Sequence, residues 1–286
     1  MAASTAALSG ITKQYKDFTL GPVDMTVPAG SIVGLIGENG AGKTTLLKIL
    51  CGVNRADDGT VDLLGGSPAD AATRAKIGVV FEDAFFYGSF TAAQVARSLA
   101  GMYGARWNAD SFSAYLRRFG LDAGKKLKEY SRGMRLKLSL AAALAHDPEL
   151  LVLDEATAGL DPVVRGELLD LFLEFIQDER HSIVMSSHIT ADLEQIADSI
   201  AYLHNGQLLF QENKDDLLQE YGVLHCGEDV LTSLSAGLVV FTRRGAYGCE
   251  SLVKERRTVQ ELLPEAVCDA ARLDDIMRFY SGRDAQ

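Results

Sequence analysis

Hydrophobic positions in the first two thirds of the chain form short uninterrupted runs separated by longer segments of helical periodicity. The runs are residues 31–36, 150–153 and 181–187, and each is apolar without alternation. Such runs are typical of parallel strands that are buried on both faces. Residues 163–179 and 190–198 between and after them have the pattern of helices. The alternation predicts a mostly parallel sheet with helices on its faces.

Other segments depart from this alternation. Residues 6–30 are predicted to form strands joined by polar turns, and a strand pair is expected around residues 58–65. Residues 91–129 have helical patterning without strand runs. Asn205 and Gly206 predict the type I′ turn of a hairpin. The apolar pattern weakens after residue 221, so we expect a main domain of residues 1–221 and a small α+β accessory region of residues 222–286.

Composition and charge narrow the class of protein. The chain is 47% hydrophobic and 23% charged, as in ordinary globular proteins, and its net charge is −11. An acidic chain repels phosphate backbones, so a nucleic-acid partner is not expected. The four cysteines have no metal-site or disulfide spacing and are read as idle thiols. The apolar runs are far shorter than a membrane span, and the first residues do not resemble a secretory signal.

A glycine-rich segment follows the first apolar run. Residues 37–44, GENGAGKT, match the pattern G-x-x-x-x-G-K-[ST] of a phosphate-binding loop, in which backbone N–H groups surround an anion at a helix N-terminus. In this interpretation Lys43 reaches the β- and γ-phosphates and Thr44 ligates Mg²⁺. The alternative is a glycine-rich turn with an exposed lysine. The residues expected to bind the nucleotide in this segment are Gly37, Asn39, Gly40, Gly42, Lys43, Thr44 and Thr45.

Two acidic residues end the second apolar run. Asp154 and Glu155 follow Leu153 directly, as expected for a buried strand that ends at a ligand-facing edge. Asp154 is predicted to hold Mg²⁺, and Glu155 to take a proton from the attacking water as general base. Adjacent side chains point to opposite faces of a regular strand, so the chain must bend there. Solvated acids at a strand end are the alternative.

His188 ends the third apolar run. A single histidine is more often structural than catalytic. Here it follows a strand of the same predicted sheet, at the edge where the phosphates are expected. We therefore predict a catalytic role for His188.

With the segment YSRGM at residues 130–134, these motifs resemble the nucleotide-binding subunit of ABC transporters. The phosphate loop, YSRGM, LLVLDEATAGLD and SSH occur in that family's order and spacing, and the resemblance covers residues 6 to about 220. It implies a P-loop NTPase core with a mostly parallel sheet flanked by helices and an antiparallel β subdomain. It also implies a helical subdomain inserted at about residues 91–145, followed by the small C-terminal α+β appendage.

The resemblance assigns further residues. In this family YSRGM, here called the signature segment, serves the phosphate loop of a second chain packed head to tail. Ser131 and Gly133 are therefore expected to bind the partner's nucleotide, with Ser131 also capping a helix. Asp161 matches the loop that crosses between subunits, and Tyr15 the aromatic that stacks on adenine, although a core tyrosine is the alternative. Glu82 replaces a metal-sensing glutamine and is expected near Mg²⁺, with a solvated acid as alternative.

The function that the resemblance implies is ATP hydrolysis that powers a separate transmembrane permease. ATP and Mg²⁺ are the expected ligands, and a second nucleotide-binding subunit, identical or not, completes the sites. The chain would be cytoplasmic and peripheral on the inner face of the membrane. The signature segment and Glu82 resemble the branch that exports drugs, antibiotics or peptides. Alternatives are an importer ATPase and a soluble ATP switch of the same family that acts without transport.

Overall fold

The computed structural model describes residues 4–82, 86–231, 234–235, 237–245 and 248–281. The chain divides into two compact units, which are considered separately. The first consists of Met1–His188 and Ala201–Phe210, and the second of Ile189–Ile200 and Gln211–Gln286.

A six-stranded sheet forms the centre of the first unit. Its strands, in spatial order, are β5 (Ile77–Val80), β6 (Leu150–Asp154), β7 (Ser182–Ser186), β3 (Ile32–Ile36), β8 (Ser199–His204) and β9 (Gln207–Asn213). The pairs β5–β6, β6–β7 and β3–β7 are parallel. Every residue of β3, β6 and β7 is buried, as the unalternating apolar runs predicted. The carboxyl ends of these parallel strands therefore meet at one edge of the sheet.

The hairpin of β8 and β9, at one edge of this sheet, confirms the turn prediction. Asn205 and Gly206 join β8 to β9 and have φ angles of 46° and 80°. Positive φ at both central residues is the requirement of a type I′ turn.

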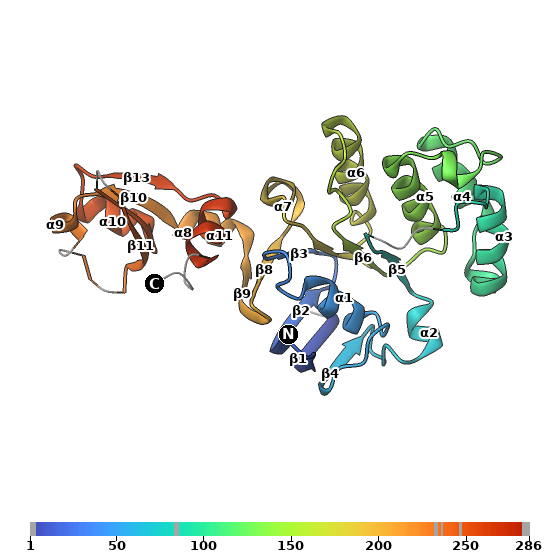
Figure 1. The fold of residues 1–286 in the computed structure, drawn as a ribbon, viewed down its shortest axis with the longest axis horizontal. Helices are drawn as coiled ribbons and strands as arrows, with labels where there is room; N and C mark the ends of the chain where they lie inside the picture. The colour runs from blue at the N-terminus through green and yellow to red at the C-terminus, as the bar shows by residue number, and fades with distance from the viewer. Residues whose placement is uncertain (1–3, 83–85, 232–233, 236, 246–247, 282–286) are drawn as a thin grey trace. The chain divides into compact units, whose positions relative to one another are not determined.

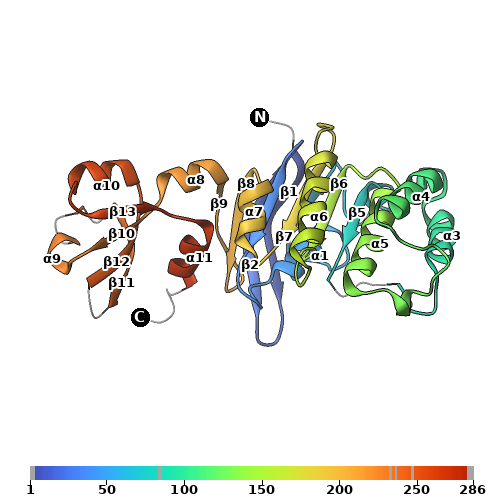
Figure 2. The same cartoon turned by 90° about the horizontal axis from the view of Figure 1, so that it is seen from above.

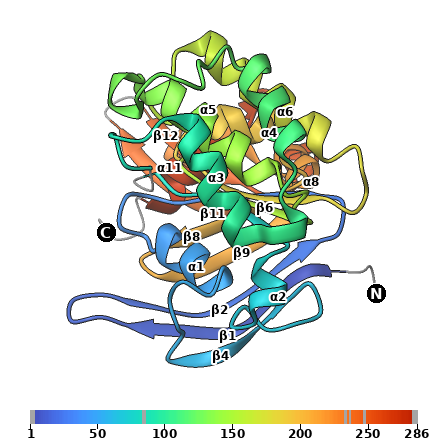
Figure 3. The same cartoon turned by 90° about the vertical axis from the view of Figure 1, so that its right-hand side faces the viewer.

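A second, antiparallel sheet carries the N-terminal strands. It consists of β2 (Thr19–Pro28), β1 (Ser4–Gln14) and β4 (Asp58–Leu63) in that order, and Figure 3 shows α1 (Lys43–Leu50) and α2 (Ala71–Arg74) on one side of it. The prediction of a strand pair within residues 58–65 is wrong. The segment forms the single strand β4, which pairs with β1, because the chain turns at Leu64 and Gly65, both at positive φ.

The helical subdomain has a hydrophobic core of its own. It contains α3 (Ala92–Tyr103), α4 (Ala109–Arg118) and α5 (Arg132–Leu144), which lie together in Figure 1, and α6 (Pro162–Phe175) follows β6. The buried side chains of Phe112, Tyr130 and Leu138 belong to this core, and the strands and α1 pack around another. Helices therefore occupy the segment with helical patterning, and the bounds of the subdomain stay a prediction.

The second unit contains both helices and strands, and residues 222–286, the predicted appendage, lie within it. Its helices are α7 (Thr190–Ile196), α8 (Lys214–Glu220), α9 (Glu228–Leu231), α10 (Arg256–Leu262) and α11 (Leu273–Ser281). Its sheet has the order β11 (Val239–Gly245), β12 (Gly248–Val253), β10 (Gly222–Cys226) and β13 (Val267–Ala270), which can be followed in Figure 2. Leu224, Val253 and Val259 are buried at its core.

Helix α7 groups with this unit through Glu194. The Glu194 carboxylate accepts a hydrogen bond of 2.8 Å from the backbone N–H of Leu273, and its backbone carbonyl accepts one of 2.9 Å from Lys214 Nζ. These bonds explain why the compact unit includes residues 189–200 and begins again at residue 211. The domain boundary after residue 221 stays a prediction.

Candidate functional site

The glycine-rich loop joins β3 to α1 and turns sharply at its end. Gly42 is the N-cap of α1 and has a φ of 107°, a conformation that side chains other than glycine rarely adopt. A Cβ atom there would lie 2.8 Å from Cζ of Phe18. The next residue, Lys43, is buried, and its Nζ donates hydrogen bonds to the carbonyls of Gly37 at 2.8 Å and Glu38 at 3.2 Å. The loop therefore holds the lysine at the N-terminus of the helix.

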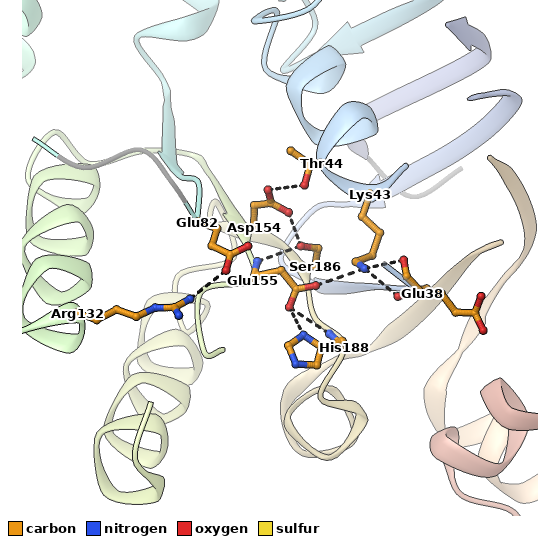
Figure 4. A network of polar contacts seen from close by, with 10 residues as sticks. Glu38, Lys43, Thr44, Glu82, Arg132, Asp154, Glu155, Ser186 and His188 are labelled. Carbon is orange, nitrogen blue, oxygen red and sulfur yellow. Dashed lines mark hydrogen bonds and ion pairs between the residues drawn. The ribbon is translucent and has the colours of Figure 1, made fainter. Parts of the chain in front are cut away.

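Asp154 connects three elements at the edge of the parallel sheet. Its Oδ1 accepts a hydrogen bond of 2.7 Å from Ser186 Oγ, and its Oδ2 accepts one of 2.8 Å from Thr44 Oγ1 (Figure 4). A carboxylate and a hydroxyl at this separation are the hard oxygen donors that Mg²⁺ prefers. Mg²⁺ usually takes one or two protein ligands and completes its shell with phosphates and water. The donor set therefore fits this ion.

The bend expected between Asp154 and Glu155 is present. Glu155 has a φ of 52°, in the left-handed region. Its backbone N–H donates to the carbonyl and to Oγ of Ser186, each at 3.1 Å, which holds the turn. The chain leaves strand geometry at this residue.

The two carboxylate oxygens of Glu155 have different surroundings. Oε2 lies 2.6 Å from Nδ1 of His188 and also accepts the backbone N–H of His188 at 3.3 Å. Oε1 is buried, lies 3.4 Å from Lys43 Nζ, and makes no hydrogen bond with any described residue. One oxygen is thus oriented by His188, and the other faces the Lys43 ammonium without a hydrogen bond of its own.

A cavity of about 400 Å³ lies beside the phosphate loop. Most of the predicted residues meet there, because its lining consists of Tyr15, Phe18, Glu38, Asn39, Gly40, Gly42, Lys43, Thr44, Thr45, Glu82 and Glu155. Gly37 and Asp154 contact this group through Lys43 and Thr44. The cavity thus has the glycine-rich loop on one part of its lining and the mostly buried acid Glu155 on another.

Aromatic side chains form part of this lining. Tyr15 is 43% exposed, and its ring centroid lies 6.4 Å from that of Phe18. An exposed aromatic surface is suited to stacking on a planar base. The stacking role of Tyr15 stays a prediction.

Sequence reasoning missed Phe18, Glu38 and Ser186. Phe18 is an apolar residue in the polar turn after Tyr15, and Ser186 lies at the end of its strand within the quoted SSH motif. These positions in the sequence could have indicated that Phe18 and Ser186 belong to the site. Glu38 offered none beyond its place inside the loop.

Three other predicted residues do not line the cavity. Ser131 Oγ accepts the backbone N–H of Met134 at 3.2 Å and so caps α5, as expected. Gly133 lies in the first turn of α5, and Asp161 caps α6 by accepting the N–H of Val164 at 3.0 Å. Their roles in a second chain's site stay predictions.

Glu82 lines the cavity, and its carboxylate is paired with an arginine. Its Oε1 accepts a hydrogen bond of 3.0 Å from Nη2 of Arg132, and both side chains are about half exposed. The expected contact of Glu82 with Mg²⁺ stays a prediction.

Cys51 is a buried thiol at the end of α1. Burial raises the pKa of Cys51 to about 12, and the nearby charge of Asp154 acts in the same direction. The thiol is therefore protonated at neutral pH, in agreement with its interpretation as an idle residue.

Comparisons with known proteins point in the same direction. A family model described as ABC transporter matches residues 20–158. An uncharacterised ABC transporter ATP-binding protein of Synechocystis is 38% identical over 207 residues, which are 70% of this chain and 58% of that relative's length. The bacitracin transport ATP-binding protein of Enterococcus faecalis is 36% identical, over 72% of this chain and 68% of its own. A lantibiotic transport ATP-binding protein of Streptococcus pyogenes is 33% identical, over 73% and 90%.

A solved structure resembles the fold. The structure described as the ATP-binding subunit of an ABC transporter superposes with a TM-score of 0.66 at 28% identity. The match covers 75% of this chain and 92% of the other. It confirms the fold class that the sequence predicted.

Proposed function

Because this chain belongs to the ABC transporter family, we propose that it is an ATPase subunit that powers a separate transmembrane permease. The observation that carries the proposal is the position of Glu155, whose Oε1 is buried beside Lys43 and whose Oε2 is bound by His188. This arrangement supplies an oriented general base at a phosphate-binding loop. The loop, the base and the lysine share one cavity wall.

Each polar group at the cavity has a defined task in this proposal. Lys43 and the backbone N–H groups at the start of α1 bind the β- and γ-phosphates, and Tyr15 stacks on adenine. Glu155 accepts a proton from the attacking water, while His188 fixes the carboxylate. Thr44 and Asp154 hold Mg²⁺, which when bound neutralises charge on the phosphates.

A second chain completes the site. Ser131 and Gly133 do not line the cavity of their own chain, yet Ser131 begins a 13-residue helix whose N-terminus suits an anion. We infer that two chains pack head to tail, so that each signature segment meets the partner's γ-phosphate. Asp161, at the start of α6, lies in the loop that crosses between them.

An apolar groove in the first unit suits a permease contact. It has a volume of about 330 Å³ and is lined among others by Val53, Val79, Phe81, Leu99 and Tyr103, from both the sheet side and the helical subdomain. None of the described helices is long and apolar enough to cross a membrane. We propose that a cytoplasmic segment of the permease binds this groove and holds the chain at the inner face of the membrane.

The proposed cargo is a drug, an antibiotic or a peptide that leaves the cell. The names of two relatives, for bacitracin transport and lantibiotic transport, support this choice. The unusual signature segment, with Arg132 and Met134, also resembled the exporter branch in sequence.

The test measures ATP hydrolysis by the purified full chain, alone and with the membrane fraction of its source. We expect hydrolysis that needs Mg²⁺, and capture of a multi-span membrane protein by a tagged chain. Substitution of Val53 by aspartate in the groove should abolish the capture and leave hydrolysis intact. A chain that hydrolyses no ATP in either setting would contradict the proposal.

A further inference from the structure

An arginine lies at an unfavourable place in the signature segment. Arg132 is the first residue of α5, directly after the cap residue Ser131. A cation near a helix N-terminus is repelled by the helix dipole. Such a residue needs a compensating anion. Glu82, 50 positions earlier in the chain, supplies it with the 3.0 Å hydrogen bond to Nη2.

The same guanidinium lies against a third segment. A Cβ atom built on Gly159 would be 3.2 Å from Nη1 and 3.5 Å from Cζ of Arg132. Gly159 has a φ of 70° and belongs to the turn between Glu155 and α6. Arg132 therefore binds the segment that follows β5 and lies close to the segment that follows β6.

These segments connect the helical subdomain to the cavity. Tyr130 and Met134, on either side of Arg132, pack in the separate core of the helical subdomain. Glu82 is the partner of the guanidinium, and Glu155 begins the turn that contains Gly159. Both acids line the cavity beside the phosphate loop. The ion pair is thus a polar link between a cavity wall and the start of α5.

We propose that Arg132 is a positioning residue that acts through Glu82. Its guanidinium, bound to Glu82 and lying on Gly159, fixes the start of α5 relative to the cavity of its own chain. It thereby sets the placement of Ser131 and Gly133 that is offered to the second chain. This inference rests on the proposed function, because only a head-to-tail dimer uses the signature segment in this way.

Arginine is suited to this task. Its planar fork donates to the carboxylate from one nitrogen while another nitrogen covers the glycine, and a lysine ammonium cannot make both contacts. Both partners are about half exposed, so salt screens the pair and its effect is modest. We expect changes of about two- to fivefold when it is broken.

The experiment reverses the two charges in the full chain. Glu82→Arg and Arg132→Glu each place like charges together, and the double variant restores the pair in reverse. Hydrogen exchange of residues 128–136 is measured by mass spectrometry without nucleotide. Glu82→Arg should speed this exchange about two- to fivefold, Arg132→Glu should speed it less because an acid at the start of α5 is favoured by the helix dipole, and the double variant should return it toward wild type. Glu82→Gln and Arg132→Gln repeat the test with smaller changes.

A second ion pair gives a matched control. Arg118 binds Glu174 with two hydrogen bonds of 2.6 and 2.9 Å, at similar exposure, between α4 and α6. Reversal of those charges should leave the exchange of residues 128–136 unchanged.

Three outcomes would overturn the proposal. The first is unchanged exchange in the single variants, and the second is a double variant that adds the two defects instead of removing them. The third concerns Mg²⁺: if Glu82→Gln raises the concentration needed for hydrolysis and Arg132→Gln does not, Glu82 acts on the metal instead. The exchange measurement needs no ATP, so it remains decisive even if the proposed ATPase activity fails.

Discussion

Nδ1 of His188 lies 2.6 Å from Oε2 of Glu155, and this short contact joins residues from the ends of two neighbouring parallel strands. The histidine holds one carboxylate oxygen, while the other lies beside Lys43. As the proposed base, Glu155 would therefore be oriented before any proton moves, which would lower the cost of reaching the reactive geometry.

Glu155→Gln should keep ATP binding and lose most turnover. The amide keeps the shape of the side chain but cannot accept the proton of the attacking water, so we expect kcat to fall about 10²- to 10⁴-fold. A fluorescent ATP analogue should bind within about twofold of wild type, and gel filtration with ATP should show a stable dimer. Glu149→Gln, which changes a partly exposed acid directly before the start of β6, is the control. Unchanged turnover would remove Glu155 from the mechanism.

His188→Ala should lower kcat through loss of the orienting contact. We expect about a hundredfold loss, less than for Glu155→Gln, because the carboxylate remains and only its orientation is lost. His225→Ala changes an exposed histidine in the second unit and should have no effect. If the two histidine variants behave alike, the contact with Glu155 has no catalytic consequence.

Asp154→Asn should raise the Mg²⁺ concentration needed for half-maximal hydrolysis by about tenfold or more. The substitution removes the negative charge of one proposed ligand. The amide of asparagine has one oxygen left, so it can still accept one of the two hydrogen bonds from Thr44 and Ser186. Nucleotide binding in the presence of a chelator should change little, which separates a metal defect from misfolding. Asp62→Asn, an exposed acid on β4, is the matched control. An identical Mg²⁺ titration in wild type and Asp154→Asn would contradict the assignment.

Two inactive chains should complement each other when mixed. Ser131→Arg damages the signature segment and Lys43→Ala damages the phosphate loop, so a head-to-tail mixed dimer contains one site with both lesions and one intact site. Equal mixing should restore roughly a quarter of the wild-type activity, since about half of the dimers are mixed. As a control, a Lys43→Ala chain is mixed with a Thr44→Ala chain. Both substitutions damage the phosphate loop, so every site in the mixed dimer is defective and activity should not return. Equal recovery in both mixtures would rule out the shared site.

Cys51 should resist alkylation in the folded chain. With a pKa of about 12, only about one thiol in ten thousand is ionised at pH 8, and the side chain is also buried. Cys226 is partly exposed and should react faster with iodoacetamide when labelling sites are mapped by mass spectrometry. Equal labelling of the two cysteines before unfolding would contradict this assignment.

Local sequence predicted the sheet and much of the site, because the relevant patterns are short. The apolar runs before Gly37, Asp154 and His188 specify buried parallel strands, and parallel strands bring their carboxyl ends to one edge. The bend at Glu155 followed from the need for two adjacent acids to face one ligand. Asn205 and Gly206 specified their turn through their tolerance of positive φ.

Contacts between distant segments were beyond such reasoning. Nothing near Glu82 indicates that its partner is Arg132, because the contact depends on how α5 packs against the loop after β5. Likewise, Phe18 lies in the turn that joins β1 to β2, and it reaches the cavity because this turn lies beside Gly42 of the phosphate loop. The pairing of β4 with β1 is a long-range choice that the pattern of residues 58–65 does not contain.

The separate core of the helical subdomain would determine how a substitution in one chain affects the other chain of the proposed dimer. A substitution such as Leu138→Ala removes a buried side chain from that core and loosens the helix that carries Ser131. The core around α1 and β3, under the chain's own phosphate loop, does not contain this residue. With the proposed head-to-tail exchange, such a chain would keep its own phosphate loop and disable its partner's nucleotide site. A defective copy expressed beside a healthy one would therefore behave as a dominant mutation.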